Sequence, residues 1–398
     1  MAANKALIKH DLLVWARKRA KVEVADAAKA AGVEPETIER WEAGKGGPTV
    51  NQLRNLAARY HFPLAVFYLP EPPADFLPLR DFRRLPNMGD RTISPSLAFH
   101  IRNAHERREL ALELHGDLSE DVRPFPLKAR LGDNPEAVGE DIRKFLGVTD
   151  DEQKRAARQD RAFDFWRRRL EENDILVFVI SGPHNSVELR EMRGFAIARN
   201  QIPVIVINGR DYSQGGKSYT LLHELAHIQL GESAITNGEP GGTEEEQRIE
   251  RFCDSVAASA LMPHHLMMSF PQVKPAGERK WNDDELRSMA NSIGVSREAF
   301  LLRLVSLRRA TWDFYNARRT KFQDEYEKAA AQKALADKKQ VKIKRPILLM
   351  SWNGRGFTRL VLRTYYDQRI TLNDVSSYLG AKLKHIPALE RAAFQMAE

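Results

Sequence analysis

The sequence predicts a mainly α-helical chain of the α+β class, with a small β-sheet between two sets of helices. Two observations lead to this prediction. Apolar residues recur at helical spacing through residues 7–60 and again after residue 219, whereas residues 175–207 contain three runs rich in β-branched and aromatic residues. The length of 398 residues suggests two to four domains, and no internal repeat is present.

The first 70 residues predict a helix-turn-helix module of short helices. These helices are expected at residues 7–19, 24–31, 35–42 and 50–60. Gly32 closes the second helix as a typical C′ residue, and Thr49 can cap the fourth. A glycine turn between the second and third short helices is typical of helix-turn-helix modules. The segment from Gly32 to Ala57 resembles the lambda-repressor-like group.

The third of these helices is the expected recognition helix, and its charges favour two different partners. Thr37, Arg40 and Lys45 are the candidate contacts to DNA. Four carboxylates lie in the same stretch and would be repelled by phosphates: Glu34, Glu36, Glu39 and Glu42. Two interpretations therefore stay open. The module binds DNA, or it docks a protein or the chain's own later domain.

The stretch after this module begins with the run Phe-Tyr-Leu-Pro-Glu-Pro-Pro at residues 67–73. Helix cannot cross these prolines, so residues 63–73 are expected to form a domain edge or an ordered connector, followed by loop at 82–90. Further helices are expected at 96–117, 135–147 and 150–172. The first of them carries a basic stripe that we expect to be a solvated face: Arg102, His105, Arg107 and Arg108.

A small β-sheet is expected next. Its strands are predicted at residues 175–180, 194–198 and 202–207. The first is a continuous apolar run, which is typical of a buried strand. Pro203 is tolerated at the edge of a sheet, so the third strand is expected at an edge. Asn208 and Gly209 then form a turn that leads towards a helix over residues 219–231.

That helix contains the pattern His-Glu-x-x-His. One helical turn separates His223 from His227, so both imidazoles can reach one metal ion. Two neutral imidazoles suit Zn²⁺, which in catalytic sites takes three protein ligands and keeps one position for water. Glu224 would lie beside that water and act as its general base. The pattern alone is insufficient, and a third ligand is required.

A polar loop is expected at residues 236–243, and the third ligand is expected on the helix after it, at residues 244–261. Thr243 and Glu246 form a capping box that opens it. Glu250 is the best candidate, because it lies mid-helix among apolar residues, and Asp254 one turn further on can accept a hydrogen bond from a liganding histidine. The other carboxylates of the helix lie in its first turn, where the helix dipole explains them: Glu244, Glu245 and Glu246.

Four segments in this order resemble the ImmA/IrrE family of metallopeptidases over about residues 160–310: residues 192–195, 203–208, 220–227 and 249–263. The proline-rich run after a helix-turn-helix module is similar to the long members of that family. The resemblance implies a zincin fold of the thermolysin-like, gluzincin type. His223, His227 and Glu250 would be the metal ligands and Glu224 the base. It implies Zn²⁺, or another divalent metal such as Mn²⁺, as cofactor.

The resemblance also implies a protein substrate, a DNA-binding repressor cleaved in a stress, mobile-element or defence response. The strand that contains Met192, Arg193, Gly194 and Phe195 is expected to hold this substrate by β-augmentation. Four side chains are candidates for stabilising the oxyanion: Tyr212, Tyr219, His264 and His265. Cys253 lies mid-helix beside Phe252, which favours a packed thiol over a nucleophile.

The remaining chain is expected to be helical. A helix-Gly-Val-Ser-helix segment, residues 282–305, is interpreted as scaffold. The expected divisions are a helix-turn-helix domain at 1–70, a connector with helices at 71–160, a metallopeptidase domain at 161–315, a charged exposed helix with linker at 316–345, and a C-terminal helical unit at 346–398.

Composition limits the class of protein. The net charge of +8 permits contact with nucleic acid but does not establish it. One cysteine excludes an intramolecular disulfide, and neither a signal peptide nor an apolar run of 18 residues is expected, so a cytoplasmic protein is predicted. The leading hypothesis is a zinc endopeptidase acting on a regulator. The alternatives are a DNA-binding regulator that uses the protease-like domain for sensing, and an antitoxin-like interaction protein.

Overall fold

The computed structural model describes residues 5–73, 80–81, 93–181, 186–236, 243–339 and 345–394. The chain divides into two compact units. Unit 1 comprises residues 1–78, 89–105 and 183–187, and unit 2 comprises residues 79–88, 106–182 and 188–398. Within the described residues, none of the helices is both long enough and apolar enough to cross a membrane.

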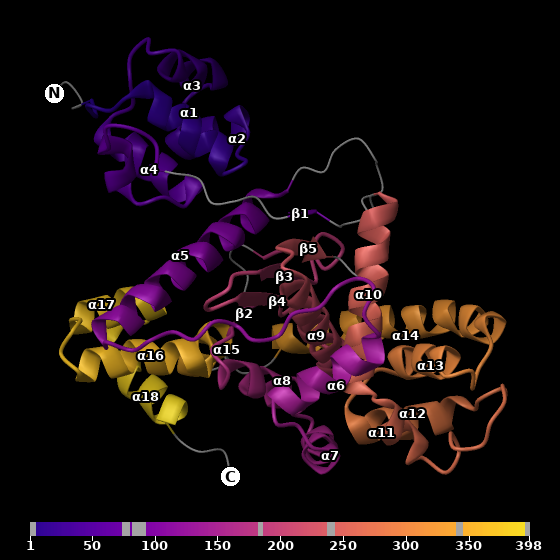
Figure 1. Cartoon of the computed structure of the whole chain (residues 1–398). Helices are drawn as coiled ribbons and strands as arrows, with labels where there is room; N and C mark the ends of the chain where they lie inside the picture. Colours follow the sequence, from indigo (N-terminus) through magenta and orange to yellow (C-terminus); the bar gives the residue numbers. More distant parts are fainter. Residues whose placement is uncertain are drawn as a thin grey trace. The chain divides into compact units, whose positions relative to one another are not determined.

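Unit 1 contains the expected helix-turn-helix bundle. Its helices are α1 His10–Arg19, α2 Val24–Ala31, α3 Pro35–Glu42 and α4 Val50–Tyr60 (Figure 1). Gly32 ends α2 with φ of 66°, and Thr49 and Gln52 form a capping box on α4. Leu53, Leu56 and Tyr60 pack with apolar residues of the other three helices into one core. Helix α1 begins three residues later than expected.

The proline-rich connector is more ordered than the sequence indicates. A 3-10 helix, η1 Leu64–Tyr68, lies directly after Pro63, although this stretch was expected to lack helix. Its Phe67 is fully buried, and its ring centre lies 6.4 Å from that of Tyr60 with the two rings tilted by 38°. A 3-10 turn fits here because Pro63 precedes it and the next proline is Pro70. The loop predicted at residues 82–90 lies outside the described residues.

The prediction of a solvated basic stripe on α5 Pro95–Asp117 is wrong. Arg102 is buried in unit 1 and donates to the backbone oxygens of Arg19 and Tyr60 at 3.2 and 3.0 Å. Arg108 is buried in unit 2 and donates to the backbone oxygens of Gln201 and Ile202. A guanidinium carries five donors, so it can be buried where carbonyl oxygens lack partners. His105 is buried as well, and the Arg107 guanidinium lies 4.9 Å above the Phe178 ring.

The helical stretch that follows contains an additional break. Helix α6 spans Pro135–Phe145, and the single helix expected at 150–172 is two helices, α7 Asp150–Arg158 and α8 Ala162–Glu171. They are separated at Asp160, which has a φ of 53°. A left-handed residue cannot continue a right-handed helix. Because of this break, α8 has its own direction, and its residues Phe163, Trp166 and Leu170 pack into the core of unit 2.

The sheet of unit 2 has five strands in the order β1-β5-β3-β4-β2 (Figure 1). These are β1 Arg80–Asp81, β2 Leu176–Ile180, β3 Gly194–Ile197, β4 Val204–Asn208 and β5 Ala234–Thr236. Strand β3 is antiparallel to both β4 and β5, whereas β1 pairs parallel to β5 and β2 parallel to β4. Three of the strands were expected, and β1 and β5 were not.

The expectation that the third predicted strand lies at an edge is also wrong. Strand β4 is internal, with β2 on one side and β3 on the other. Pro203 precedes the strand rather than belonging to it, so no donor is missing from the ladder. Its carbonyl still accepts from the backbone nitrogen of Leu176 at 3.0 Å.

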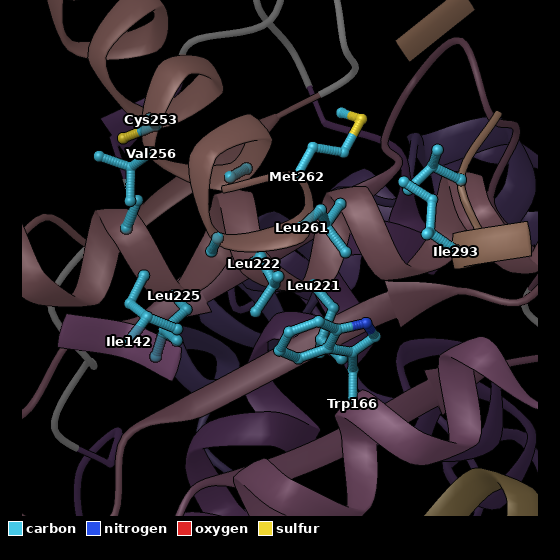
Figure 2. Close-up of a cluster of buried hydrophobic side chains, with 14 of the residues drawn as sticks. Ile142, Trp166, Leu221, Leu222, Leu225, Cys253, Val256, Leu261, Met262 and Ile293 are labelled. Atoms are coloured by element: carbon cyan, nitrogen blue, oxygen red, sulfur yellow. The ribbon is translucent and has the colours of Figure 1, made fainter. Parts of the chain in front are cut away.

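Two helices, α9 Gln214–Leu230 and α10 Glu244–Leu261, pack against each other next to this sheet. Ser213 caps α9, and Gly231 ends it with a φ of 75°. Leu222 and Leu225 of α9 and Val256 and Leu261 of α10 share a buried cluster that Trp166 closes from α8 (Figure 2). The core therefore fixes the two helices on which metal ligands were expected.

The remaining elements are helical, as expected. They are α11 His264–Met268, α12 Asp283–Ile293, α13 Arg297–Ser306, α14 Trp312–Lys339, α15 Arg345–Asn353, α16 Arg355–Tyr366, α17 Leu372–Leu379, η2 Leu383–His385 and α18 Ile386–Phe394. The charged helix expected from residue 316 lies within α14 and is mostly exposed over residues 316–330, although Phe322 is buried and Glu325 pairs with Arg297 of α13. In the C-terminal part, the Phe357 ring meets that of Phe178 on β2 at 5.6 Å.

Candidate metal centre

His223 and His227 occupy one face of α9, as their spacing predicted. Their Nε2 atoms lie 3.1 Å apart, and both side chains are almost fully buried. A helix places residues four apart on the same side, so the long, capped α9 is what sets this distance.

Glu250 of α10 completes a three-residue cluster with them. Its Oε2 lies 3.5 Å from Nε2 of His223, and its Oε1 lies 3.1 Å from Nε2 of His227. Three ligands at about 2.05 Å from a tetrahedral zinc ion would be about 3.3 Å apart. The three ligand atoms lie within 4.8 Å of one another, so the cluster fits a metal ion of this kind.

The electrostatics of the cluster favour a positive charge between the ligands. Burial opposes ionisation of Glu250, but the adjacent His223 outweighs it and lowers the pKa of Glu250 to about 2. Burial also opposes protonation of His223, yet the Glu250 and Asp254 carboxylates raise its pKa well above the ordinary value. For His227 burial prevails and its pKa is lowered. A carboxylate beside a neutral imidazole is the donor set that Zn²⁺ takes.

Asp254, one turn after Glu250 on α10, orients the first histidine. Its Oδ1 lies 3.0 Å from Nδ1 of His223 and accepts a second hydrogen bond, also 3.0 Å, from the Tyr219 hydroxyl. A proton held on Nδ1 leaves the lone pair of a neutral imidazole on Nε2, facing Glu250. The Tyr219 hydroxyl is therefore engaged by Asp254. Burial, followed by the Asp254 charge, raises the pKa of Tyr219 well above its ordinary value.

Glu224 lies beside the cluster and is completely buried. Its Oε1 accepts a 2.6 Å hydrogen bond from the Thr236 hydroxyl of β5, whereas its Oε2 has no hydrogen-bond partner among the described residues. Burial raises the pKa of Glu224 to about 8, although His223 acts in the opposite direction. One oxygen is thus held by the protein and the other is left for a further group.

The comparisons with known proteins agree with this geometry. Residues 171–305 match the family model described as the IrrE N-terminal-like domain, of peptidase family M78. Unit 2 contains an IrrE-like peptidase domain. Residues 11–67 match a helix-turn-helix domain model. No curated protein and no solved structure matches the chain.

Three of the four candidates for stabilising the oxyanion make contacts away from the His223, His227 and Glu250 cluster. The Tyr212 hydroxyl donates to the backbone oxygen of Tyr326, and the two rings stack at 4.7 Å. His265 lies between Glu140 and Asp150, and His264 is exposed. Together with the engagement of Tyr219 by Asp254, this means that the structure brings none of the four to the cluster as a free donor.

The strand expected to bind substrate is not open. Strand β3 of the IrrE-like domain is flanked on both sides, by β4 and by β5, so its backbone has no free edge for β-augmentation. Met192 and Phe195 are fully buried. Arg193 is partly exposed and lies 3.5 Å from Asp211, and Gly194 packs directly against Glu224. The prediction failed because β5 was not recognised.

Two residues near the cluster were missed or little used at the sequence level. Thr236 was assigned to a loop, since a three-residue strand has no periodicity that the sequence reveals. Cys253 is fully buried, as expected, and burial raises the pKa of its thiol well above the ordinary value. That is the behaviour of a packed thiol rather than of a nucleophile.

The exposed negative charge around α3, the expected recognition helix, is smaller than the sequence indicates. Glu42 is held by Arg17 through two hydrogen bonds of 2.7 and 2.9 Å, with both side chains mostly buried. It therefore belongs to the bundle rather than to an outer face. The exposed charges of the α3 region are Glu34, Glu36 and Glu39 against Arg40 and Lys45, and Arg40 also contacts the Thr37 hydroxyl.

Proposed function

We propose that the protein is a zinc-dependent endopeptidase that cleaves a DNA-binding transcriptional regulator. The observation that carries this proposal is the buried cluster of His223, His227 and Glu250 with Glu224 next to it, whose Oε2 has no hydrogen-bond partner in the described part of the chain. The match of residues 171–305 to a peptidase family supports the reaction class. Two imidazoles with one carboxylate favour Zn²⁺ over Mn²⁺, which prefers oxygen ligands.

Zinc held by these three residues would polarise the scissile carbonyl and lower the pKa of a coordinated water. Glu224 takes the proton of the attacking water at Oε2 and passes it to the nitrogen of the leaving amine as the peptide bond breaks. Asp254 keeps a proton on Nδ1 of His223, so that Nε2 stays available for the metal. The Thr236 hydroxyl holds Oε1 of Glu224 throughout.

The substrate class rests on the helix-turn-helix match in the same chain and on the family resemblance. In this proposal the protease removes a repressor in a stress, mobile-element or defence response. The experiment is co-expression of the full chain with DNA-binding regulators encoded nearby, followed by immunoblotting for a regulator fragment. We expect a fragment with the wild type and with Glu244→Gln, whose carboxylate is exposed in the first turn of α10, and none with Glu224→Gln.

The alternative function is a DNA-binding regulator whose IrrE-like domain serves sensing or protein interaction. The pairing of Glu42 with Arg17 favours it, because one of the four repelling carboxylates is neutralised. An equal effect of wild type and Glu224→Gln on transcription, together with DNA binding that Arg40→Ala and Lys45→Ala weaken, would support this alternative. It would also exclude proteolysis as the function.

A further inference from the structure

The hydrogen bond between Thr236 and Glu224 joins a strand of the sheet, β5, to the helix α9. Thr236 is the last residue of β5, and Glu224 lies in the middle of α9. The hydroxyl oxygen and Oε1 of the carboxyl group are 2.6 Å apart, which is at the short end of the range for O–H···O hydrogen bonds. Both side chains are buried, Thr236 to 3% exposure and Glu224 to 0%.

The sheet fixes the position of this hydroxyl. The backbone oxygen of Thr236 accepts from the backbone nitrogen of Arg193 at 2.9 Å, and Thr236 stands opposite Gly194 in the β3–β5 register. The lack of a side chain at Gly194 makes room for Glu224. A Cβ at that position would lie 2.8 Å from Oε1 and 3.1 Å from Cγ of Glu224. Gly194 of β3 and Thr236 of β5 thus form a slot in which the Glu224 carboxyl group lies.

A glutamate needs such a slot to keep its carboxylate in one orientation. The last torsion of the glutamate side chain is broad, so the carboxylate rotates freely unless one oxygen is bound. Here Oε1 is bound by Thr236 and Oε2 has no hydrogen-bond partner within the part of the chain that the structure describes. The hydroxyl therefore engages one oxygen and leaves the other, Oε2, able to bind a further group.

We propose that Thr236 is a positioning residue: its hydroxyl holds Oε1 of Glu224 so that Oε2 faces the group bound between His223, His227 and Glu250. This inference rests on the proposed function, since it assigns Thr236 a role in the same site. It differs from a purely structural role, which would affect folding and metal affinity but not the hydrogen bonding of a metal-bound molecule to Glu224.

The test uses the zinc-loaded full chain and acetohydroxamic acid as the probe. A hydroxamic acid chelates zinc and gives its hydroxyl proton to a neighbouring carboxylate, so its affinity reports where that carboxylate lies. Zinc affinity is measured separately, by competition with a chromophoric chelator. Thr236→Val keeps the shape and removes the hydroxyl, Thr236→Ser restores it, and Glu224→Gln is the positive control. Thr364→Val is the matched control. Thr364 is also fully buried, and its hydroxyl donates to the Leu360 backbone oxygen within α16 rather than to a residue of the site.

We expect Thr236→Val to bind zinc like the wild type and acetohydroxamic acid about tenfold more weakly, as for loss of a hydrogen bond to a charged group. Thr236→Ser and Thr364→Val should bind zinc and acetohydroxamic acid with the same affinities as the wild type. Unchanged hydroxamate affinity in Thr236→Val with intact zinc binding would overturn the role of Thr236 and leave the proposed function standing. A wild type that binds no zinc would overturn both.

A second variant covers the case in which Thr236→Val does not fold. Gly194→Ala leaves the Thr236 hydroxyl in place and adds a Cβ that would lie 2.7 Å from Cγ2 of Thr220 and 2.8 Å from Oε1 of Glu224, so both of these side chains must move. We expect it to retain zinc and to lose hydroxamate affinity by a similar factor. Wild-type hydroxamate affinity in Gly194→Ala would show that the placement of the carboxylate in this slot is unimportant, and would overturn the inference.

Discussion

His223 of α9 and Asp254 of α10 are joined by a 3.0 Å hydrogen bond between Nδ1 and Oδ1. The bond links the two helices that carry the proposed metal ligands, and it leaves Nε2 of His223 facing Glu250. The same Asp254 oxygen accepts from Tyr219, so the carboxylate is itself held in place. The proposed metal centre therefore depends on both helices together rather than on the His-Glu-x-x-His pattern alone.

Replacing Asp254 should weaken zinc binding without removing a ligand. In Asp254→Ala, His223 loses the acceptor for its Nδ1 proton and can turn or change tautomer. Loss of such a partner typically costs 10–100-fold in metal affinity, and we expect about that. The measurement is chelator competition at constant pH, with Asp284→Ala as control, since the Asp284 side chain is 85% exposed. Equal zinc affinity in Asp254→Ala and the wild type would contradict this account of the hydrogen bond.

The packing of α6 on α10 should be sensitive to a single methyl group. A Cβ at Gly139 would lie 2.8 Å from the backbone nitrogen of Ala260 and 2.9 Å from the backbone carbon of Ser259. Backbone cannot yield as a side-chain end does, so Gly139→Ala should lower the free energy of unfolding by about 1–3 kcal/mol. Denaturant titration tests this. Gly132→Ala is the control, because its Cβ would meet nothing within 4 Å. Equal stability of the two variants would argue against close packing here.

An ion pair between a buried arginine and a partly exposed glutamate should make stability depend on pH in the acid range. Arg303 is 3% exposed in its side chain and pairs with Glu136, which links α13 to α6. Burial raises the pKa of Glu136, but the Arg303 hydrogen bonds outweigh it and the pKa lies below its ordinary value of 4.5. The folded pKa is thus the lower one. The pair's contribution is present above pH 4.5 and is lost as the pH falls through the folded pKa.

Glu136→Gln should therefore lower the free energy of unfolding at pH 7 by about 2 kcal/mol. Breaking a fully buried pair costs more, and the partial exposure of Glu136 reduces the effect. The difference from the wild type should shrink as unfolding is measured at successively lower pH below 4.5. Glu140→Gln, which alters a more exposed contact to His265, serves as control. A difference that stays constant from pH 7 to pH 3 would rule out this pair as its source.

The sequence predicts the parts of the site that local patterns determine. The spacing of His223 and His227, the capping box of Thr243 and the apolar surroundings of Glu250 are all local, and the structure brings these three potential ligands together. The helix-turn-helix bundle was predictable for the same reason, because Gly32 and Thr49 mark the helix ends.

The parts that were wrong depend on contacts between distant residues. Whether Arg102 and Arg108 face solvent is decided by carbonyl oxygens of other segments, and a helix pattern does not contain that information. The internal position of β4 and the pairing of β3 with β5 follow from strand order, which three short apolar runs do not fix. Thr236 was assigned to a loop because a three-residue strand has no periodicity, and the contacts that engage Tyr212, Tyr219 and His265 come from segments distant in the sequence.

The zinc content of the purified full chain tests the central claim most directly. Elemental analysis after purification without chelators should give about one zinc per chain for the wild type, since catalytic zinc is held by three protein ligands and one water. His227→Ala and Glu250→Ala should lose it, and Glu224→Gln, which removes no ligand, should retain it. A wild type without stoichiometric zinc, or a Glu250→Ala variant that keeps it, would contradict the assignment of this cluster as the metal centre.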